Sequence, residues 1–200
     1  MTLIELMVAV VIFALLFAMG SRSFMTWIQN QQIRTGAESI LNGMQLARSE
    51  AVKRNASALF VLCDVAAGNT GSSWDVLAAS AIAVAQACGP DAGAATGWER
   101  VQQRSGQEGS RKAVVATATG ANAIAFNGFG RVVALATLPP SVSVIVQSIT
   151  QVNVSNPVLG NCETATVAGA RCLRITAGAG GNLRMCDPSP KLALTDPRHC

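Results

Sequence analysis

The chain has 200 residues, of which half are hydrophobic, and carries a formal net charge of +4. This length accommodates one membrane-length helix and one globular domain with a core of its own. The charge is spread evenly, with five cations and three anions up to Asn55 and ten cations and eight anions from Ala56 onward. This balance argues against a dedicated nucleic-acid-packaging protein but is compatible with a local basic patch.

The first predicted element is an apolar helix from Met1 to Gly20, in which Glu5 is the only ionisable side chain. A charged group costs roughly 2.5 to 3.5 kcal/mol at the centre of a membrane-length helix, so its presence predicts a function. The only cation close enough to neutralise Glu5 is the α-amino group of Met1, from the same chain or a neighbouring copy. A cleaved secretory signal peptide and a plain membrane anchor are the alternatives, although a signal peptide would carry a basic residue earlier than Arg22.

The helix is predicted to continue to Lys53 as an amphipathic segment, which gives it a total length of about 80 Å. Apolar or small residues recur at the three-and-four spacing of one helical stripe, and polar residues recur on the opposite face. The stripe should pack on a globular head. Glycines at positions 20, 36 and 43 are weak points in the helix. The stripe comprises Ile33, Ala37, Ile40, Leu41, Met44, Ala47 and Ala51, and the polar face Arg34, Glu38, Asn42, Gln45, Ser49 and Lys53.

After Asn55 the pattern changes to short β-branched or alternating runs, separated by Gly, Pro and Asn, which indicate strands. The predicted fold class is α+β, with a long N-terminal helix packed on an antiparallel β head that contains disulfides. We divide the chain into an apolar helix (1–28), an amphipathic helix (29–55) and a β-rich head with a C-terminal tail (56–200). Within Ala66–Gly97, the run Trp74–Ala87 fits either a strand or a helix. The predicted strands are Ala58–Cys63, Ala113–Thr117, Ala123–Phe126, Arg131–Leu138, Val142–Ser148, Arg171–Thr176 and Asn182–Cys186.

Six cysteines, an even number, lie outside the apolar helix and indicate an oxidising compartment. There is no Cys-x-x-Cys pair and His199 is the only histidine, so a disulfide framework is favoured over a zinc site. Of the 15 pairings that six cysteines allow, we favour the sequential one because it closes three compact loops. The last loop would stabilise the fold by roughly 3 kcal/mol. The pairs are Cys63 with Cys88, Cys162 with Cys172, and Cys186 with Cys200.

No motif or spacing predicts catalysis. His199 has no second histidine with which to form a metal site. The run Ala177–Gly181 lacks the Gly-Lys-Ser/Thr ending and the following helix of a phosphate-binding loop, and predicts a hairpin turn. Glu163, Asp187 and Asp196 are scattered acids without an apolar pocket. We therefore predict a protein that is not an enzyme and that uses no metal or cofactor.

Three segments resemble one family. The start, Met1-Thr2-Leu3-Ile4-Glu5-Leu6-Met7-Val8-Ala9-Val10, resembles the beginning of mature type IV pilins and pseudopilins. The Ala-Arg-Ser-Glu-Ala run at 47–51 and the Phe-x-x-x-Gly-Arg pattern at 126–131 are similar to the FimT, FimU and GspH branch of minor pilins and pseudopilins. Both runs also have structural interpretations. Arg48 and Glu50 fit a helix end, Asn127-Gly128 would supply positive-φ turn residues, and Phe126 and Val132–Leu135 would supply core.

The resemblance implies a membrane stage and a filament stage. The N-terminal helix would be held in the inner membrane with a periplasmic head, and would later pack in the core of an extracellular or periplasmic filament. Glu5 would neutralise the terminal amine of an adjacent subunit and set its register. Met1 would be the residue that prepilin peptidase exposes, or else an initiator methionine. The implied partners are other pilin or pseudopilin subunits.

The C-terminal tail resembles a DNA-binding segment. FimT-type minor pilins bind DNA during natural transformation through a Gly-Arg-x-Arg motif, and Gly181-Asn182-Leu183-Arg184 matches it with Asn182 in place of the first arginine. From position 171 onward five cations stand against two acids, a small patch that could contact the phosphates of double-stranded DNA without reading sequence. A disulfide-closed edge with solvated charges is the structural alternative. The five cations are Arg171, Arg174, Arg184, Lys191 and Arg198.

Two classes of function are therefore open. The favoured class is a low-abundance structural subunit of a type IV pilus, near the tip, that helps to initiate assembly. The same subunit could instead present its basic tail to DNA, or serve as a GspH-like pseudopilin of type II secretion. The paired cysteines of the tail favour the pilus by resemblance, and neighbouring genes would separate the pilus from the secretion system.

Overall fold

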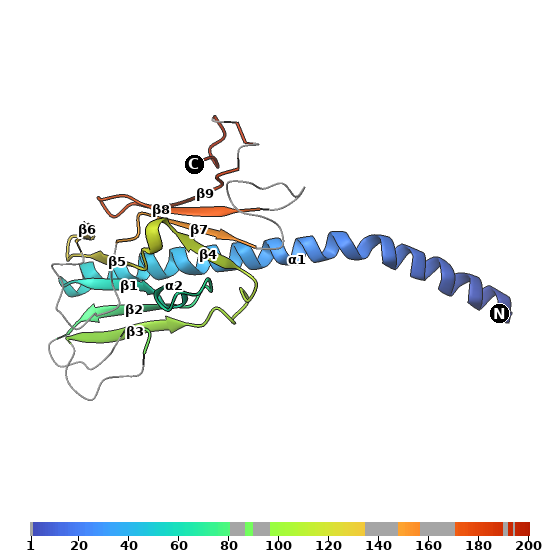
Figure 1. Ribbon diagram of the computed structural model, residues 1–200, viewed down its shortest axis with the longest axis horizontal. Helices are drawn as coiled ribbons and strands as arrows, with labels where there is room; N and C mark the ends of the chain where they lie inside the picture. Colours follow the sequence, from blue (N-terminus) through green and yellow to red (C-terminus); the bar gives the residue numbers. More distant parts are fainter. Residues whose placement is uncertain are drawn as a thin grey trace.

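The computed structural model describes residues 2–80, 87–89, 97–134, 148–156, 171–189, 192–193 and 195–200, without the side chains of residues 18–23 and 119. Its dominant element is one continuous helix, α1 (Leu3–Arg54), which extends far beyond the head (Figure 1). Thr2 caps the N-terminus of α1. Asn55 caps the C-terminus in the left-handed region (φ 48°), and its N–H donates to the carbonyls of Ala51 and Val52. Among the described residues, no helix meets the length and hydropathy of a membrane span.

The predicted weak points of the helix do not interrupt it. A Cβ at Gly43 would lie 2.7 Å from the Phe60 ring, and one at Gly36 would lie 3.2 Å from the Cβ of Ala113. These two glycines therefore allow the head to approach the α1 backbone closely.

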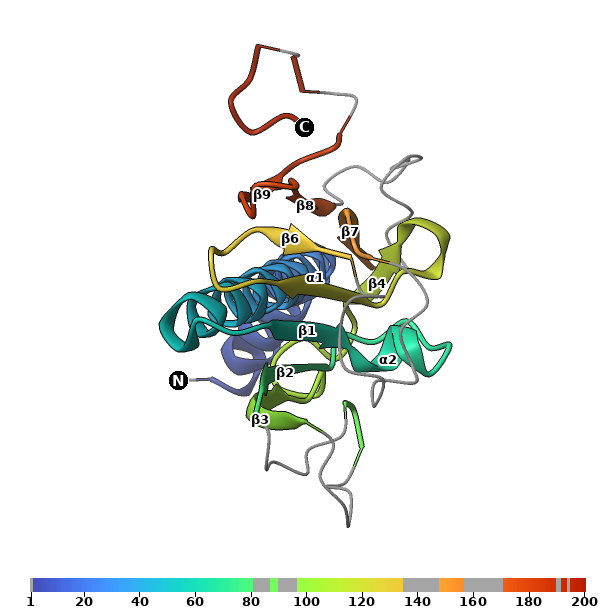
Figure 2. The same cartoon turned by 90° about the vertical axis from the view of Figure 1, so that its left-hand side faces the viewer.

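The head contains two antiparallel sheets. The five-stranded sheet has the order β3-β2-β1-β5-β6, and the four-stranded sheet the order β4-β7-β8-β9. Seen along α1, β8 and β9 lie on one side of the helix and β2 and β3 on the other (Figure 2). The strands are β1 (Ala58–Leu62), β2 (Trp74–Ala79), β3 (Trp98–Arg104), β4 (Val114–Thr117), β5 (Ala123–Phe126), β6 (Val132–Val133), β7 (Gln151–Ser155), β8 (Leu173–Ala177) and β9 (Leu183–Cys186). Two short helices, α2 (Cys63–Ala66) and the 3₁₀ helix η1 (Ala118–Gly120), complete the described elements.

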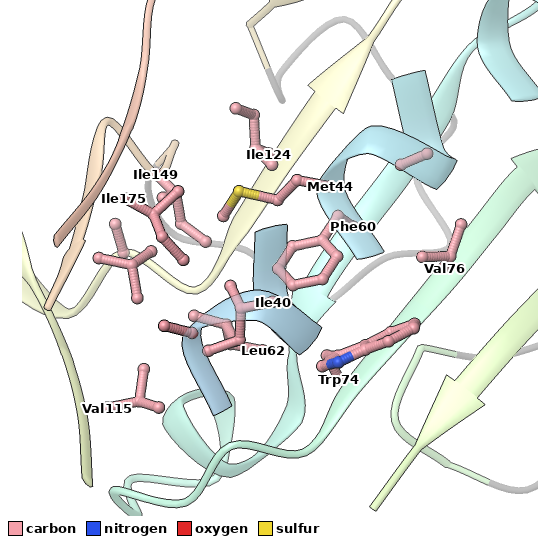
Figure 3. Packing of buried hydrophobic residues seen from close by; sticks show 14 of the residues in the cluster. Ile40, Met44, Phe60, Leu62, Trp74, Val76, Val115, Ile124, Ile149 and Ile175 are labelled. Carbon is pink, nitrogen blue, oxygen red and sulfur yellow. The ribbon is translucent and has the colours of Figure 1, made fainter. Parts of the chain in front are cut away.

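The main core forms where both sheets meet the predicted stripe of α1. Ile40 and Met44 are fully buried among side chains from β1, β2, β5 and β8 (Figure 3). The Trp74 indole N–H donates to the buried Ser39 hydroxyl at 2.8 Å, which fixes β2 on the helix. All the stripe residues are buried except Leu41, which is partly buried, so the predicted α+β class with the helix packed on antiparallel sheets is confirmed.

The five-stranded sheet is buried on both faces. The alternate residues of β1 that point away from α1, Leu59 and Val61, form a second core with Trp98 and Ala125. This double burial explains why the whole of β1 is apolar, because a strand with one face in solvent would alternate apolar and polar residues.

Several strand predictions need correction. Cys63 begins α2 instead of ending β1, and the strand expected from Arg131 covers only Val132 and Val133 among its described residues. Ala134, expected in the core, is exposed. Of the strand expected at 142–148, only Ser148 is described, in an isolated parallel bridge with Ala123. Strands β3 and β7 were not predicted, and the open run at 74–87 begins as strand β2.

Two disulfides follow the predicted sequential pairing. Cys63 is bonded to Cys88, and Cys186 to Cys200. Cys172 is also disulfide-bonded, but its predicted partner Cys162 lies outside the described residues.

Candidate functional site

The N-terminal half of α1 is the largest exposed apolar surface among the described residues. Its large apolar side chains face solvent, whereas those of the C-terminal half are buried or partly buried in the head, except for Val52. From Leu3 to Phe17, its apolar side chains form one continuous exposed surface along the helix. The exposed residues are Leu3, Ile4, Leu6, Met7, Val8, Val10, Val11, Ile12, Phe13, Leu15, Leu16, Phe17, Phe24, Met25 and Trp27.

Glu5 belongs to a capping box at the start of α1. The Thr2 N–H donates to Glu5 Oε2, and the Glu5 N–H donates to Thr2 Oγ1, both at 3.4 Å. The carboxylate is exposed. Met1, the predicted source of the neutralising amine, lies outside the described residues.

A groove of about 660 Å³ separates α1 from the C-terminal tail. Leu173 and Met185 supply apolar side chains to its lining, and three arginines line it, one each from α1, the residues before β8 and the tail. The arginines are Arg34, Arg171 and Arg198, and α1 adds Trp27, Asn30 and Gln31. The Asn30 side-chain oxygen accepts the Arg171 N–H at 3.2 Å, which ties the entry to β8 to the helix.

Two of the three groove arginines are neutralised locally. Arg34 pairs with Glu38 at 2.7 Å, and Arg198 binds both carboxylate oxygens of Asp196, at 3.0 and 2.7 Å. The Arg198 hydrogen bonds lower the pKa of Asp196 to about 2. Arg171 makes no ion pair with any described residue, so it is the groove arginine most open to an anion.

The other predicted DNA-binding cations lie on a different surface. Arg174 on β8 and Arg184 on β9 share the face of the four-stranded sheet that points away from α1, because Thr176 pairs with Arg184 and Arg174 with Cys186. Arg174 Nε donates to Asn153 Oδ1 at 2.8 Å. Arg184 Nη2 donates to the carbonyls of Pro197 and His199 at 3.0 and 3.1 Å, and so anchors the tail.

The structure therefore divides the predicted patch into two pairs. Arg171 and Arg198 line the groove beside α1, whereas Arg174 and Arg184 lie on the outer face of the sheet. The fifth predicted cation, Lys191, lies outside the described residues.

Two glycines join the sheets at the far end of α1. A Cβ at Gly181, where φ is +81°, would lie 1.9 Å from the Gly130 carbonyl oxygen, so only glycine fits there. The same oxygen accepts a hydrogen bond from the Arg48 Nε–H group at 3.2 Å, and the Val132 N–H donates to the Ala179 carbonyl. The glycine of the tail motif is thus a packing residue.

The β5–β6 turn differs from the prediction. Its positive φ (+71°) falls on Gly130, whereas Asn127 and Gly128 keep negative values. The physical reason is the Asn127 side chain, whose oxygen accepts the N–H groups of Phe129 and Arg131 at 3.0 and 3.1 Å and folds a longer turn.

Two carboxylates of the head are buried. Glu50 accepts hydrogen bonds from Arg54 and Lys53, which lower its pKa, in agreement with a structural role for this residue. Asp75 is fully buried beside Arg100 and the Cys88 N–H, and burial raises its pKa. Among the described positions, no group of three or more potential ligands is placed to hold a metal ion.

The sequence interpretation missed the aromatic member of the groove. It found no aromatic side chain in the tail, but the fold brings Trp27 of α1 to the same groove as Arg171 and Arg198. Trp27 stacks on Phe24 with ring centroids 6.0 Å apart. The signal in the sequence was this aromatic pair itself, which follows the apolar run after only three residues.

Comparison with known proteins identifies a family. Residues 36–195 match the sequence model of the family described as type II transport protein GspH. Two solved structures of the type IV minor pilin FimU from Pseudomonas aeruginosa strain PAO1 are similar, with 13% and 14% identity and TM-scores of 0.45 and 0.46. The alignments cover 76% and 80% of this chain and 90% and 91% of the FimU chains. No curated protein sequence gave a significant match. Because the family match spans most of its length, the chain belongs to the GspH family of pilin-like proteins.

Proposed function

We propose that this protein is a minor structural subunit of a type IV pilus that enters the filament through the N-terminal half of α1. The observation that carries this proposal is the run of exposed apolar side chains from Leu3 to Trp27 on a helix whose other half is buried. Contiguous apolar surfaces of this kind mark interaction or membrane sites. Packing against the equivalent helices of neighbouring subunits would remove the run from water. Membership of the GspH family supports this role for the chain, which we regard as structural and not catalytic.

Before assembly, the same half of α1 would reside in the inner membrane, with the head in the periplasm. The sequence from Met1 to Gly20 supports this stage because Glu5 is its only ionisable side chain. The disulfides of the head support an oxidising compartment. On assembly, Glu5 would exchange the Thr2 N–H for the terminal amine of an adjacent subunit, which would neutralise its charge where the helices pack.

The proposal is tested by following the protein into sheared filaments of the producing cells. We expect Glu5→Gln to keep the protein in the membrane fraction and to remove at least 90% of it from the filament fraction, roughly the effect of 1.4 kcal/mol or more. Glu38→Gln, which alters an exposed carboxylate on the packed half of α1, is the control and should assemble normally. Normal incorporation of Glu5→Gln would refute assembly through this carboxylate.

We place the subunit near the filament tip, where it would help to initiate assembly. The low-abundance role of the resembling minor pilins supports this placement. Immunogold labelling should then mark filament ends, and deletion of the gene should lower the number of filaments and not their length. Label along the whole filament would contradict the placement.

A secretion pseudopilus is the alternative filament, and the description of the matching family as type II transport protein GspH supports it. Neighbouring genes for an outer-membrane secretin, a secretion ATPase and further pseudopilins would favour secretion. Neighbouring minor pilins and an adhesin would favour the pilus. Loss of exoprotein secretion on deletion, with surface pili unchanged, would decide for the pseudopilus.

DNA binding is a second candidate function, favoured by the common face of Arg174 and Arg184. The test is a titration of duplex DNA against the full chain in detergent, between low and physiological salt. The logarithm of the binding constant falls with the logarithm of the salt concentration, with a slope set by the number of phosphate contacts. If both arginines contact phosphates, the double variant Arg174→Ala, Arg184→Ala should make this slope shallower by about two units, roughly one for each contact. Arg111→Ala, an exposed cation elsewhere on the head, is the control. Absence of binding at low salt would leave assembly as the sole role.

A further inference from the structure

One apolar side chain of the head is held out in solvent by an ordered turn. Phe129, in the β5–β6 turn, is 84% exposed. Among the described large apolar residues that are exposed, only Phe129 and Val52 lie outside the N-terminal half of α1. The Phe-x-x-x-Gly-Arg motif therefore has a feature that core packing does not explain.

The turn is fixed on several sides. Its own hydrogen bonds include the two N–H groups held by the Asn127 side chain and the Gly130 N–H donated to the Asn127 carbonyl at 2.8 Å. Arg48 Nε holds the Gly130 carbonyl, and a Cβ at Gly128 would lie 2.5 Å from Asn55 Oδ1. Burial of the Phe129 ring would stabilise the fold, but the ring stays in solvent. Because the turn that carries it is already ordered, a partner that binds the ring would lose little conformational entropy in the turn.

The surface around the ring is small and basic. Val52 lies against the turn, because a Cβ at Gly130 would be 3.2 Å from its Cγ2 and 3.1 Å from Arg48 Nε. Lys53, which follows Val52 in the chain, and Arg131, at the end of the turn, are exposed. The nearby carboxylate Glu50 is already bound by Lys53 and Arg54, and Arg131 makes no ion pair with a described residue. The Phe129 knob, defined as Phe129, Val52, Arg48, Lys53 and Arg131, therefore fits an apolar socket with an acidic rim.

The position of the knob indicates where its partner lies. The β5–β6 turn is at the end of the head farthest from the N-terminus of α1 (Figure 1). In a filament held together by α1, this end faces the next head along the axis.

A second copy of this chain does not fit that position. The opposite end of its head carries the exposed cations Arg111, Lys112 and Arg171. Two of them are placed there by α1, since the Lys112 N–H donates to Gln32 Oε1 at 3.3 Å and the Arg171 N–H to Asn30 Oδ1 at 3.2 Å. Stacking two copies would bring cations against cations, which disfavours the contact.

We propose that the Phe129 knob docks into a different pilin-like subunit, whose facing surface has an apolar socket rimmed by carboxylates. This inference rests on the proposed function, since it names the neighbour of the subunit within the filament. It also gives a reason for a minor subunit to sit next to another chain and not to polymerise with itself.

The test places a photoreactive benzoylphenylalanine at position 129 of the full chain, in cells that assemble the filament. The expected result is an adduct with one other pilin-like subunit, mapped by mass spectrometry to a segment that contains Asp or Glu. Arg131→Glu should lower the yield of that adduct about fivefold, the effect of roughly 1 kcal/mol at a charged rim. Arg111→Glu makes the same charge change at the other end of the head and should leave the yield within about twofold.

The same photoreactive residue at position 27 separates the two proposals. Adducts with pilin-like subunits from position 27, but none from position 129, would overturn the knob and leave the proposed function intact. Adducts of position 129 with copies of this chain would also overturn it. Absence of pilin-like adducts from both positions would overturn the proposed function and the knob together.

A second measurement does not depend on cross-linking. Phe129→Ser should reduce incorporation into filaments about fivefold, whereas Phe129→Met should largely retain it because methionine also fills apolar sockets. Both variants should unfold at the temperature of the unaltered protein, since the ring is exposed. Equal incorporation of the two variants would overturn the proposal.

Discussion

The two halves of α1 are one continuous helix with opposite surroundings. In the N-terminal half, Leu3 and Phe13 are 79% and 72% exposed, whereas Ile33, Ile40 and Met44 in the C-terminal half are fully buried. The C-terminal half is therefore part of the folding unit, because both sheets pack on it. The N-terminal half contributes little to the stability of the head and is available to neighbouring helices or lipid. The helix thus joins a surface that is buried on folding to an apolar surface that stays exposed.

The strongest test of this contrast compares a buried and an exposed apolar residue of α1. Ile40→Ala should lower the free energy of unfolding of the head by about 4 kcal/mol, because it removes side-chain volume where both sheets meet the helix. Phe13→Ala should change it by less than about 0.5 kcal/mol. Urea unfolding of the full chain in detergent, followed by tryptophan fluorescence, measures both. Similar losses for the two variants would show that the halves are not energetically separate.

The next test concerns the junction between the sheets. Gly181→Ala should cost about 3 kcal/mol, because the new Cβ would meet the Gly130 carbonyl oxygen in a backbone conformation that favours glycine. Gly180→Ala is the matched control, since a Cβ there would meet no atom closer than 3.9 Å. The measurement is the same urea titration. A tolerated Gly181→Ala would mean that the two turns separate easily.

The third test uses two tryptophans. Trp74→Phe should cost about 1.5 kcal/mol, because the buried Ser39 hydroxyl loses the indole N–H. Trp27→Phe, in the exposed part of α1, should leave the unfolding midpoint unchanged. Differential scanning calorimetry compares the two shifts. An equal shift for both would place Trp27 in the folding unit.

The smallest expected effect is a pH dependence at the end of the packed half. Hydrogen bonds from Arg54 and Lys53 lower the pKa of Glu50 below its ordinary value of 4.5. The stabilisation that ionised Glu50 gives the fold is therefore complete above about pH 4.5. It is lost as the pH falls through the lower pKa that Glu50 has in the folded protein. Because Lys53 is largely exposed, the effect should be below about 1 kcal/mol. Melting temperatures from pH 6 to 3 should fall less for Glu50→Gln than for the unaltered protein, and an identical fall would contradict this.

The sequence predicted those parts of the fold in which local pattern and tertiary burial agree. The stripe of α1 was evident from its spacing, and β1 and β5 were evident from continuous apolar runs. Strand β3 was missed because Trp98–Arg104 is a largely polar edge strand that carries three charged residues. Strand β7 was missed although Val152 and Val154 alternate with Gln151 and Asn153, the signature of a half-buried strand.

The candidate site was less predictable because its chemistry depends on contacts between distant segments. The cations of the tail could be identified one by one, but their partners could not. Arg184 is held by carbonyls of the closed tail, and Arg174 by an asparagine on β7. Trp27 and Arg171 are 144 positions apart in the chain and meet only because β8 begins beside α1.

The amide contacts of Asn30 and Gln32 decide where the chain can be shortened for work in solution. These side chains accept the N–H groups of Arg171 and Lys112, one from each flank of the head. A fragment that begins at Gln29 retains both contacts and discards most of the surface that would cause aggregation. A fragment that begins at Ile33 is only four residues shorter, but it would leave the entries to β8 and β4 without their attachments to the helix.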